Sequence, residues 1–158
     1  IWESCFASKK IAIERKIPYL EWRYREKPFS DYKIFRAVDN QQNTIGVLIT
    51  AVTEKKGLKV VYIMEMMAEN DDRDVYKSFL KFLDRHAREN GADAVSMLCL
   101  PNNPNKGLFY RHGLVPVPRK MFPQDIHFCA RANSLKIDKA YLTDSENWFI
   151  TWGDLDIV

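Results

Sequence analysis

The sequence contains only three cysteines, and their spacing excludes two kinds of site. Cys5, Cys99 and Cys129 are far apart, no C-x-x-C pair occurs, and the three histidines are scattered. Neither a disulfide framework nor a set of metal ligands follows from such an arrangement. Cys99 and Cys129 stand in apolar runs, so we expect both side chains to be buried as small hydrophobic residues. We therefore expect no metal site.

Long hydrophobic runs and a strong net charge are also lacking. No apolar run reaches the length of a membrane span and no signal peptide is visible, which favours a reducing, cytoplasmic setting without a membrane partner. A formal charge of +3 on a chain with 28% charged residues is too mild for a DNA-binding surface. Because the chain opens with Ile1 rather than Met, we expect a fragment or the C-terminal part of a longer chain. A dimer, or contact with a neighbouring domain of the same chain, stays open.

What is present fits a single folded domain over residues 1–158. Apolar residues make up 46% of the chain and aromatic residues 13%, which is enough for a full core. Periodicity and turn residues predict helices over 8–17 and 18–26, strands over 32–38, 44–53 and 58–67, a helix over 74–90, a strand over 94–100, a short helix ending at Gly113, and strands over 114–117, 126–132 and 148–152. Short turns join the first three strands, so we expect them to pair antiparallel.

Three local motifs and the order of these elements resemble one superfamily. The first motif is Trp22-Arg23-Tyr24 ahead of Pro28, which is similar to a W-x-Y-x-x-x-P opening. The second spans residues 105–114 and is similar to N-x-x-A-x-x-L-Y-x-x-x-G-F. The third spans residues 148–156 and is similar to the C-terminal tail of the same group of proteins. These pieces resemble the GCN5-related N-acetyltransferase (GNAT) superfamily, in particular members found with bacterial surface-polysaccharide genes. The resemblance implies an α+β fold with α/β/α layers, in which a mixed six- to seven-stranded central sheet is flanked by about four helices.

The resemblance also implies a reaction and a cofactor. Members of the superfamily transfer an acetyl group from acetyl-CoA to an amine, here a small-molecule amine or amino sugar. The pantetheine arm would lie between the strand ending near Met67 and the strand beginning near Ala94. The cofactor-binding residues implied in this chain are Met66, Met67, Arg73, Asp74, Val75, Asn102 and Asn105.

The expected phosphate loop departs from the family pattern. Such loops read R/Q-x-x-G-x-G/A, because backbone N–H groups at a helix start hold the diphosphate. The matching stretch, residues 71–76, has Asp72 or Asp74 and Tyr76 near the places of the two glycines. A β-carbon at either place would crowd the close approach of the backbone to the diphosphate, and a carboxylate would repel it. An aspartate N-cap also occupies the backbone N–H groups that the phosphate would need. Arg73 is the one basic residue left to compensate.

Two residues are candidates for proton transfer. The family places a tyrosine four residues before the helix-ending glycine, but Phe109 stands there and Tyr110 is rotated from it by about 100°. Tyr110 is therefore either a catalytic acid or a packing or surface residue. Glu65 interrupts a run of methionines and suits a general base if burial raises its pKa; alternatively, it points to solvent. Asp154 and Asp156 reach the cleft only if the last strand lies beside it, and turn capping by Asp154 is the alternative.

Three functions remain open. The first is an acyl-CoA-dependent N-acyltransferase with an atypical phosphate loop. The second is a catalytically degenerate GNAT-fold domain used for binding or scaffolding in a larger protein. The third is an aminoacyl-tRNA-dependent relative without CoA, for which the basic N-terminal third of the chain would contact RNA.

Overall fold

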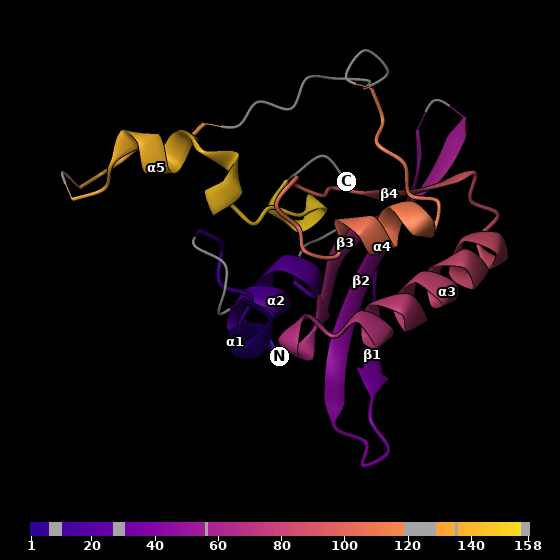
Figure 1. Cartoon of the computed structure of the whole chain (residues 1–158). Helices are drawn as coiled ribbons and strands as arrows, with labels where there is room; N and C mark the ends of the chain where they lie inside the picture. Colours follow the sequence, from indigo (N-terminus) through magenta and orange to yellow (C-terminus); the bar gives the residue numbers. More distant parts are fainter. Residues whose placement is uncertain (7–10, 27–30, 56, 119–128, 135, 156–158) are drawn as a thin grey trace.

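A computed structural model describes residues 1–6, 11–26, 31–55, 57–118, 129–134 and 136–155. Its helices are α1 (Trp2–Phe6), α2 (Ile17–Tyr24), α3 (Arg73–Glu89), α4 (Lys106–Arg111) and α5 (Lys139–Thr143), and its strands are β1 (Tyr32–Val38), β2 (Thr44–Lys55), β3 (Leu58–Ala68) and β4 (Ala94–Met97). Short 3-10 helices lie at η1 (Glu69–Asp71), η3 (Ser145–Asn147) and η4 (Trp152–Asp154). Figure 1 shows α5 standing away from the sheet, on a segment that returns to the domain at η4.

The four strands form one mixed sheet in the order β1-β2-β3-β4. β1, β2 and β3 pair antiparallel, as the short turns predict, and β4 pairs parallel to β3. The β3–β4 ladder covers only Val60 to Ile63 on β3, although β3 continues to Ala68. The two strands therefore separate beyond the pair formed by Ile63 and Met97.

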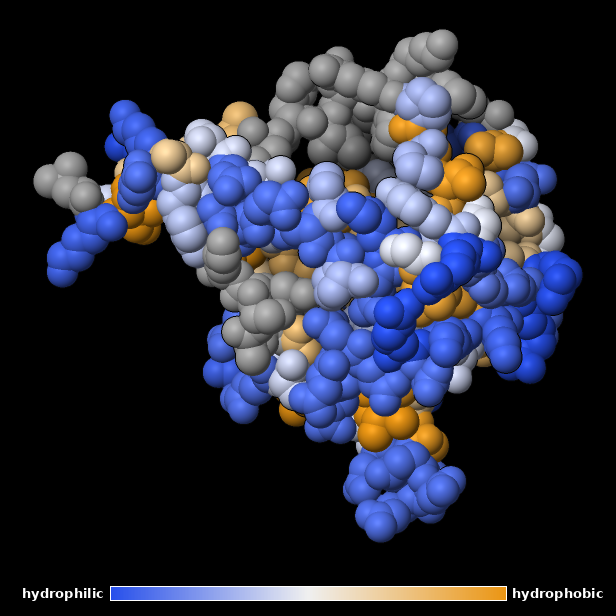
Figure 2. All heavy atoms as spheres, in the orientation of Figure 1, coloured by the Kyte–Doolittle hydropathy of each residue, from blue (hydrophilic) through white to orange (hydrophobic). Residues whose placement is uncertain are grey.

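Helix α3 covers one face of the sheet because its apolar residues share one stripe. Seven residues of this helix are buried, namely Val75, Tyr76, Phe79, Leu80, Leu83, His86 and Ala87. Gly46 on β2 permits the close approach, since a Cβ there would lie 2.6 Å from a methyl group of Val75 and 2.9 Å from the ring of Phe79. The outer surface of α3 is mainly hydrophilic (Figure 2), as the predicted amphipathic helix requires.

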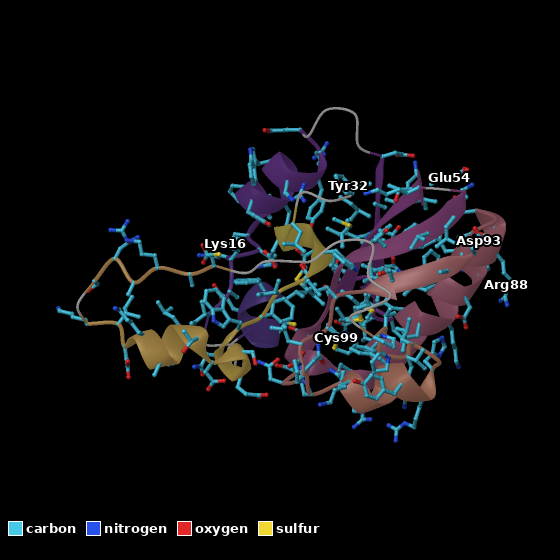
Figure 3. The ribbon with its side chains drawn as sticks, turned by 90° about the horizontal axis from the view of Figure 1, so that it is seen from above. Lys16, Tyr32, Glu54, Arg88, Asp93 and Cys99 are labelled. Carbon is cyan, nitrogen blue, oxygen red and sulfur yellow. The ribbon has the colours of Figure 1, made fainter. Side chains whose placement is uncertain are left out.

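The opposite face of the sheet is covered by α2 and the C-terminal segment. Tyr24, Ile49, Met64 and Trp152 pack together there. A β-bulge at Met64 changes the alternation of β3, because Ile49 pairs with Glu65 while Thr50 pairs with Ile63. Seen from above, Lys16 lies on the α2 side and Arg88 at the far end of α3 (Figure 3). The sheet therefore lies between a layer formed by α3 and a layer formed by α2 and the C-terminal segment.

Several predicted elements differ from the structure. The sheet of the described residues has four strands, so the count of six to seven is not confirmed. Residues 114–117 form no strand, because Pro116 has no N–H to donate to a ladder. Residues 129–132 are also irregular, and 126–128 lie outside the described residues. Residues 148–152 make a single bridge, between Trp148 and Ile11, before the η4 turn.

The first predicted helix, over residues 8–17, is also wrong where it is described. Residues 11–16 form no helix, and Ile11 hydrogen-bonds to the backbone on either side of Trp148. Three consecutive apolar residues, 11–13, do not form one helical face, so periodicity gave no real support for a helix. The structure instead has α1, at residues for which no helix was predicted. Cys129 is exposed and Cys99 half-buried, so the expectation that both are buried fails.

The described part of the chain contains no helix with the length and apolar composition of a membrane span. Among the same residues, no three His, Cys, Asp or Glu side chains are grouped to hold a metal ion.

Candidate functional site

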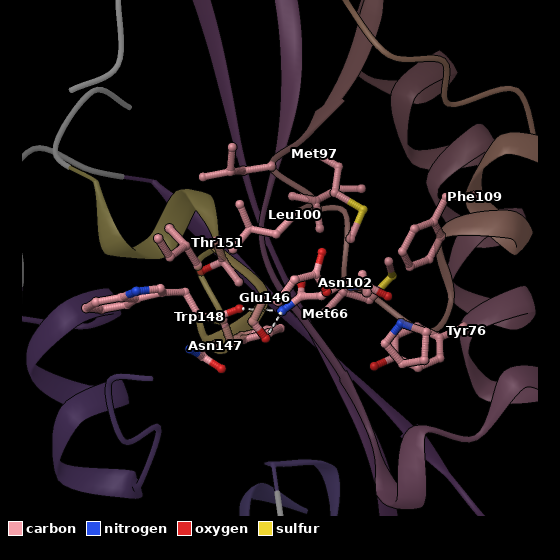
Figure 4. Close-up of a pocket in the computed structure, with 16 residues that line it drawn as sticks. Met66, Tyr76, Met97, Leu100, Asn102, Phe109, Glu146, Asn147, Trp148 and Thr151 are labelled. Carbon is pink, nitrogen blue, oxygen red and sulfur yellow. Dashed lines mark hydrogen bonds between the residues drawn. The ribbon is translucent and has the colours of Figure 1, made fainter. Parts of the chain in front are cut away.

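A cavity of about 330 Å³ opens where β3 and β4 separate. Ile63 and Met66 line it from β3, Met97 lies at the end of β4, and Leu98 and Leu100 follow in the next segment. Rings of Tyr76 and Phe109 stand on one side and the C-terminal segment on the other (Figure 4). The cavity therefore lies at the edge of β3 that carries no β4 partner beyond Ile63.

Asn102 holds the two sides of the cavity together. Its side-chain amide donates to the carbonyl oxygens of Glu146 and Trp148, both at 3.0 Å (Figure 4). The predicted cofactor-binding residue Asn102 thus lines the cavity and also fixes its C-terminal wall. Asn105 is buried at the start of α4 but does not line the cavity, whereas Asn103 does.

Glu146 is the one charged residue among those that line the cavity. It belongs to η3, whose start is capped by Asp144 through a hydrogen bond to the amide of Glu146. The remaining polar lining comes from Tyr76, Thr151 and asparagine side chains. The cavity lining is consequently about half polar and half apolar and carries one carboxylate, a combination that favours a ligand with both apolar and polar parts and a cationic group.

The tyrosine that lines the cavity is Tyr76 rather than the predicted Tyr110. Tyr110 is 47% exposed on α4 and does not line the cavity, while Phe109 is buried and does. Tyr76 takes the inner position, its ring 6.0 Å from that of Phe109 in an edge-to-face arrangement. Its hydroxyl donates to Asp71 at 3.2 Å, and burial raises the pKa of this phenol. Tyr76 therefore remains protonated and hydrogen-bonded beside the cavity.

The predicted cofactor residues on β3 point to opposite faces. Met66 lines the cavity and packs with the α3 core, whereas Met67 packs against Cys5 of α1. Val75 is buried in the α3 core, and Arg73 and Asp74 are exposed at the start of that helix. Of the seven predicted cofactor residues, the structure therefore brings Met66 and Asn102 to the cavity.

Glu65 lies in a buried polar cluster behind the cavity wall and does not line the cavity. Its Oε1 atom accepts from the Tyr24 hydroxyl at 2.9 Å and from Arg15 Nε at 3.2 Å. Arg15 also donates to Asp154 and, at 3.2 Å, to the hydroxyl of Thr151, a residue that lines the cavity. Aromatic rings of Trp2, Tyr19 and Phe149 surround the guanidinium at 5.5 to 5.8 Å. The cluster joins the N-terminal segment, β3 and the tail.

Burial sets the electrostatics of this cluster. Desolvation raises the pKa of Glu65, and the neighbouring Arg15 opposes that rise. The second carboxylate oxygen of Glu65 has no hydrogen-bond partner among the described residues. Gly153 leaves the space that the cluster needs, because a Cβ there would lie 2.1 Å from the Tyr24 hydroxyl. Asp154 caps the η4 turn together with Thr151, the alternative role foreseen for it, and Asp156 lies outside the described residues.

The acidic turn before α3 is closed by its own side chains. The Asp72 carboxylate accepts from the amides of Asp74 at 2.7 Å and Val75 at 3.3 Å. The amide of Tyr76 donates to the Asp72 carbonyl at 3.2 Å. The amides of Asp74 and Val75 are among the donors that would hold a phosphate at a helix start. The predicted aspartate cap is therefore present, and the turn does not fit a diphosphate.

Solved structures of similar fold were found, although no protein-family model and no curated protein matches the sequence. A probable acetyltransferase is 16% identical with a TM-score of 0.55, covering 72% of this chain and 77% of its own. A protein from Pyrococcus furiosus named as a putative acetyl transferase is 15% identical with a TM-score of 0.56; the match covers 78% of this chain and 89% of that protein. The chain therefore shares the fold of these acetyltransferase structures. An aminoglycoside acetyltransferase from an uncultured soil metagenomic sample, solved in complex with trehalose, is 18% identical with a TM-score of 0.55 and 83% coverage of both chains.

Sequence reasoning missed three residues of the candidate site and the polar cluster beside it. Glu146 lies in a tail whose helical turns carry no clear periodicity. Tyr76 was considered only for the apolar stripe of the predicted helix and for a glycine position of the phosphate loop. Arg15 is flanked by Glu14 and Lys16, so it reads as part of a solvated charged segment. The signal that could have identified Tyr76 is its hydroxyl, since a buried tyrosine requires a polar neighbour.

Proposed function

We propose that this protein is a GNAT-like N-acyltransferase that binds the acyl-pantetheine arm of a thioester donor in the cavity and acylates a small cationic amine. The observation that carries the proposal is the separation of β3 from β4 after Ile63, with the cavity opening at that point. A thioester supplies the acyl group as an activated electrophile when it is bound.

The cavity suits the arm in size and polarity. Its volume of about 330 Å³ lies at the lower end of the range for small-molecule sites. Ile63, Met66 and Met97 provide apolar contact, and the unpaired edge of β3 provides backbone groups for amide hydrogen bonds. Thr151 and Asn103 add polar groups at fixed places. The diphosphate of CoA finds no comparable site at the start of α3.

The acceptor amine is proposed from the charge of the cavity. Glu146 is exposed to solvent at the cavity and supplies the negative charge that a protonated amine would pair with. The same carboxylate can accept the proton that the amine must lose before it attacks. Glu65 is held in the ion pair with Arg15, so we assign it to positioning the tail rather than to proton transfer.

The experiment is acyl transfer from acetyl-CoA to a panel of amino sugars and alkyl amines, followed by mass spectrometry of the acylated product. We expect product with at least one cationic amine and none with neutral analogues. Glu146→Gln should lower kcat/KM by about tenfold, equivalent to about 1.4 kcal/mol. Glu21→Gln, an exposed change on α2, is the matched control and should retain activity. Absence of product with every amine would refute the acyltransferase.

A second function is favoured by a specific observation. Tyr110 is outside the cavity, and Glu65 is sequestered, so the two residues first predicted for proton transfer do not meet there. A catalytically degenerate domain that binds a cationic ligand in the same cavity fits this arrangement. Saturable binding of an amine that depends on Glu146, without any acyl transfer, would select this function over the first.

A further inference from the structure

The turn that would hold the nucleotide of CoA is negatively charged. From Glu69 to Lys77 the chain has four carboxylates and two cations, namely Glu69, Asp71, Asp72, Asp74, Arg73 and Lys77. Lys77 is already paired with Asp74 at 2.7 Å. A diphosphate at this place would meet a net negative charge, and charges a few ångströms apart at a protein surface repel appreciably.

Three backbone donors of the turn, the amides of Asp72, Asp74 and Val75, are already engaged. Asp72 donates its own amide to the Glu69 carbonyl at 3.0 Å and caps Asp74 and Val75 with its side chain. An anion that displaced this carboxylate would leave it without partners beside a second negative charge. Exchange of a built-in anion for an external one at the same amides gains little.

Helix α1 covers a further side of the turn. Cys5 is buried, and its thiol donates to the Asp71 carboxylate at 3.6 Å and lies 4.0 Å from the Tyr76 hydroxyl. Tyr76 donates to the same carboxylate oxygen at 3.2 Å. The inward side chain of the turn is thus bound to the body of the protein, and α1 lies against η1.

We infer that the acyl donor is recognised through its acyl-pantetheine arm alone, and that the nucleotide diphosphate contributes no binding at the start of α3. This inference rests on the proposed function, because the arm occupies the cavity assigned there. The donor class is therefore a thioester of a pantetheine-type arm, with or without an adenine nucleotide.

Titration calorimetry with S-acetylpantetheine and acetyl-CoA, on the whole chain, tests the inference. We expect dissociation constants that agree within about threefold, because both ligands share the arm. Acetyl-CoA binding tighter by tenfold or more would overturn the inference and leave the proposed function intact. Failure of both ligands to bind would overturn the proposed function and the inference with it.

Two variants of Asp72 test the reason for the exclusion. Asp72→Gly removes the carboxylate and frees the amides of Asp74 and Val75, and glycine is itself a tolerated N-cap residue. This variant should bind acetyl-CoA severalfold more tightly than the wild type does, while its dissociation constant for S-acetylpantetheine stays unchanged. Asp72→Asn keeps a capping oxygen. The ratio of its dissociation constants for S-acetylpantetheine and acetyl-CoA should therefore stay close to that of the wild type. An unchanged ratio in Asp72→Gly would overturn the assignment of the exclusion to this cap.

Discussion

Arg15 and Glu65 form an ion pair with an Nε to Oε1 distance of 3.2 Å, and both side chains are completely shielded from solvent. The pair joins the segment before α2 to the inner strand β3, and Arg15 continues the connection to Asp154 in the tail. The C-terminal wall of the cavity depends on this connection, because Thr151 lines the cavity and also accepts a hydrogen bond from Arg15. Its stability is therefore a condition for the proposed function.

Replacement of Arg15 by Met should destabilise the protein by about 3 kcal/mol or more. The change leaves Glu65 and Asp154 without their shared cation, and an unpaired buried charge is costly. Urea unfolding measures the loss. Arg25→Met is the matched control, since Arg25 pairs with Glu21 at an exposed site and should change stability by less than about 0.5 kcal/mol. A loss below about 1 kcal/mol for Arg15→Met would show that the buried pair contributes little.

The stability contributed by Glu65 should decrease as pH rises. Burial raises the pKa of Glu65 in the folded protein, so the folded state holds this proton more tightly than the unfolded state does. The contribution is complete below the unfolded pKa, about 4.3, and is lost as pH rises through the folded pKa. We expect the difference in unfolding free energy between the wild type and Glu65→Gln to fall from about pH 4 to about pH 8. A difference that is constant or grows over this range would contradict the direction of the shift.

Gly153→Ala should destabilise the protein, whereas Gly107→Ala should not. A Cβ at Gly153 would lie 2.1 Å from the Tyr24 hydroxyl and 2.4 Å from Glu65 Oε1, so the buried cluster would have to move. Overpacking of this kind costs about 1 to 3 kcal/mol. At Gly107, within α4, a Cβ meets nothing within 4 Å, and alanine should raise stability by about 0.5 kcal/mol. Equal melting temperatures for the two variants would argue against the tight packing of Gly153.

Asp72→Ala should destabilise α3 by about 1 kcal/mol, because the amides of Asp74 and Val75 lose their shared acceptor. Chemical unfolding gives the value, and hydrogen exchange at the first turn of α3 should locate the effect. Asp72→Asn preserves an acceptor and should lose much less stability. A loss as large in Asp72→Asn as in Asp72→Ala would mean that the charge, rather than the cap, is what stabilises the helix.

Much of the central fold could be predicted, because its signals are local. The strand over 32–38 matches β1 residue by residue, and the apolar stripe from Val75 to Ala87 identified the buried face of α3. The aspartate cap also follows from sequence, since N-caps need only a short side chain before a periodic segment. These elements depend on neighbours within a few positions along the chain.

The site could not be predicted to the same extent, because it is assembled over long sequence distances. The bulge at Met64 decides that Glu65 points away from the cavity, and only pairing with β2 reveals it. Arg15 meets Asp154 across 139 positions, and nothing near either residue indicates a buried pair. Tyr110 and Phe109 differ by one step on a short helix, so the motif alone left the inner residue open.

The most direct test of the cavity as the donor site is calorimetric titration of acetyl-CoA into the wild type and into Met97→Trp. Met97 lines the cavity at the end of β4, and an indole there fills the space for the arm. Leu58→Trp, at a position 51% exposed at the start of β3, is the matched control. We predict saturable binding to the wild type and to Leu58→Trp, and at least tenfold weaker binding to Met97→Trp. Equal affinity of all three proteins, or no binding to the wild type at millimolar ligand, would contradict the account.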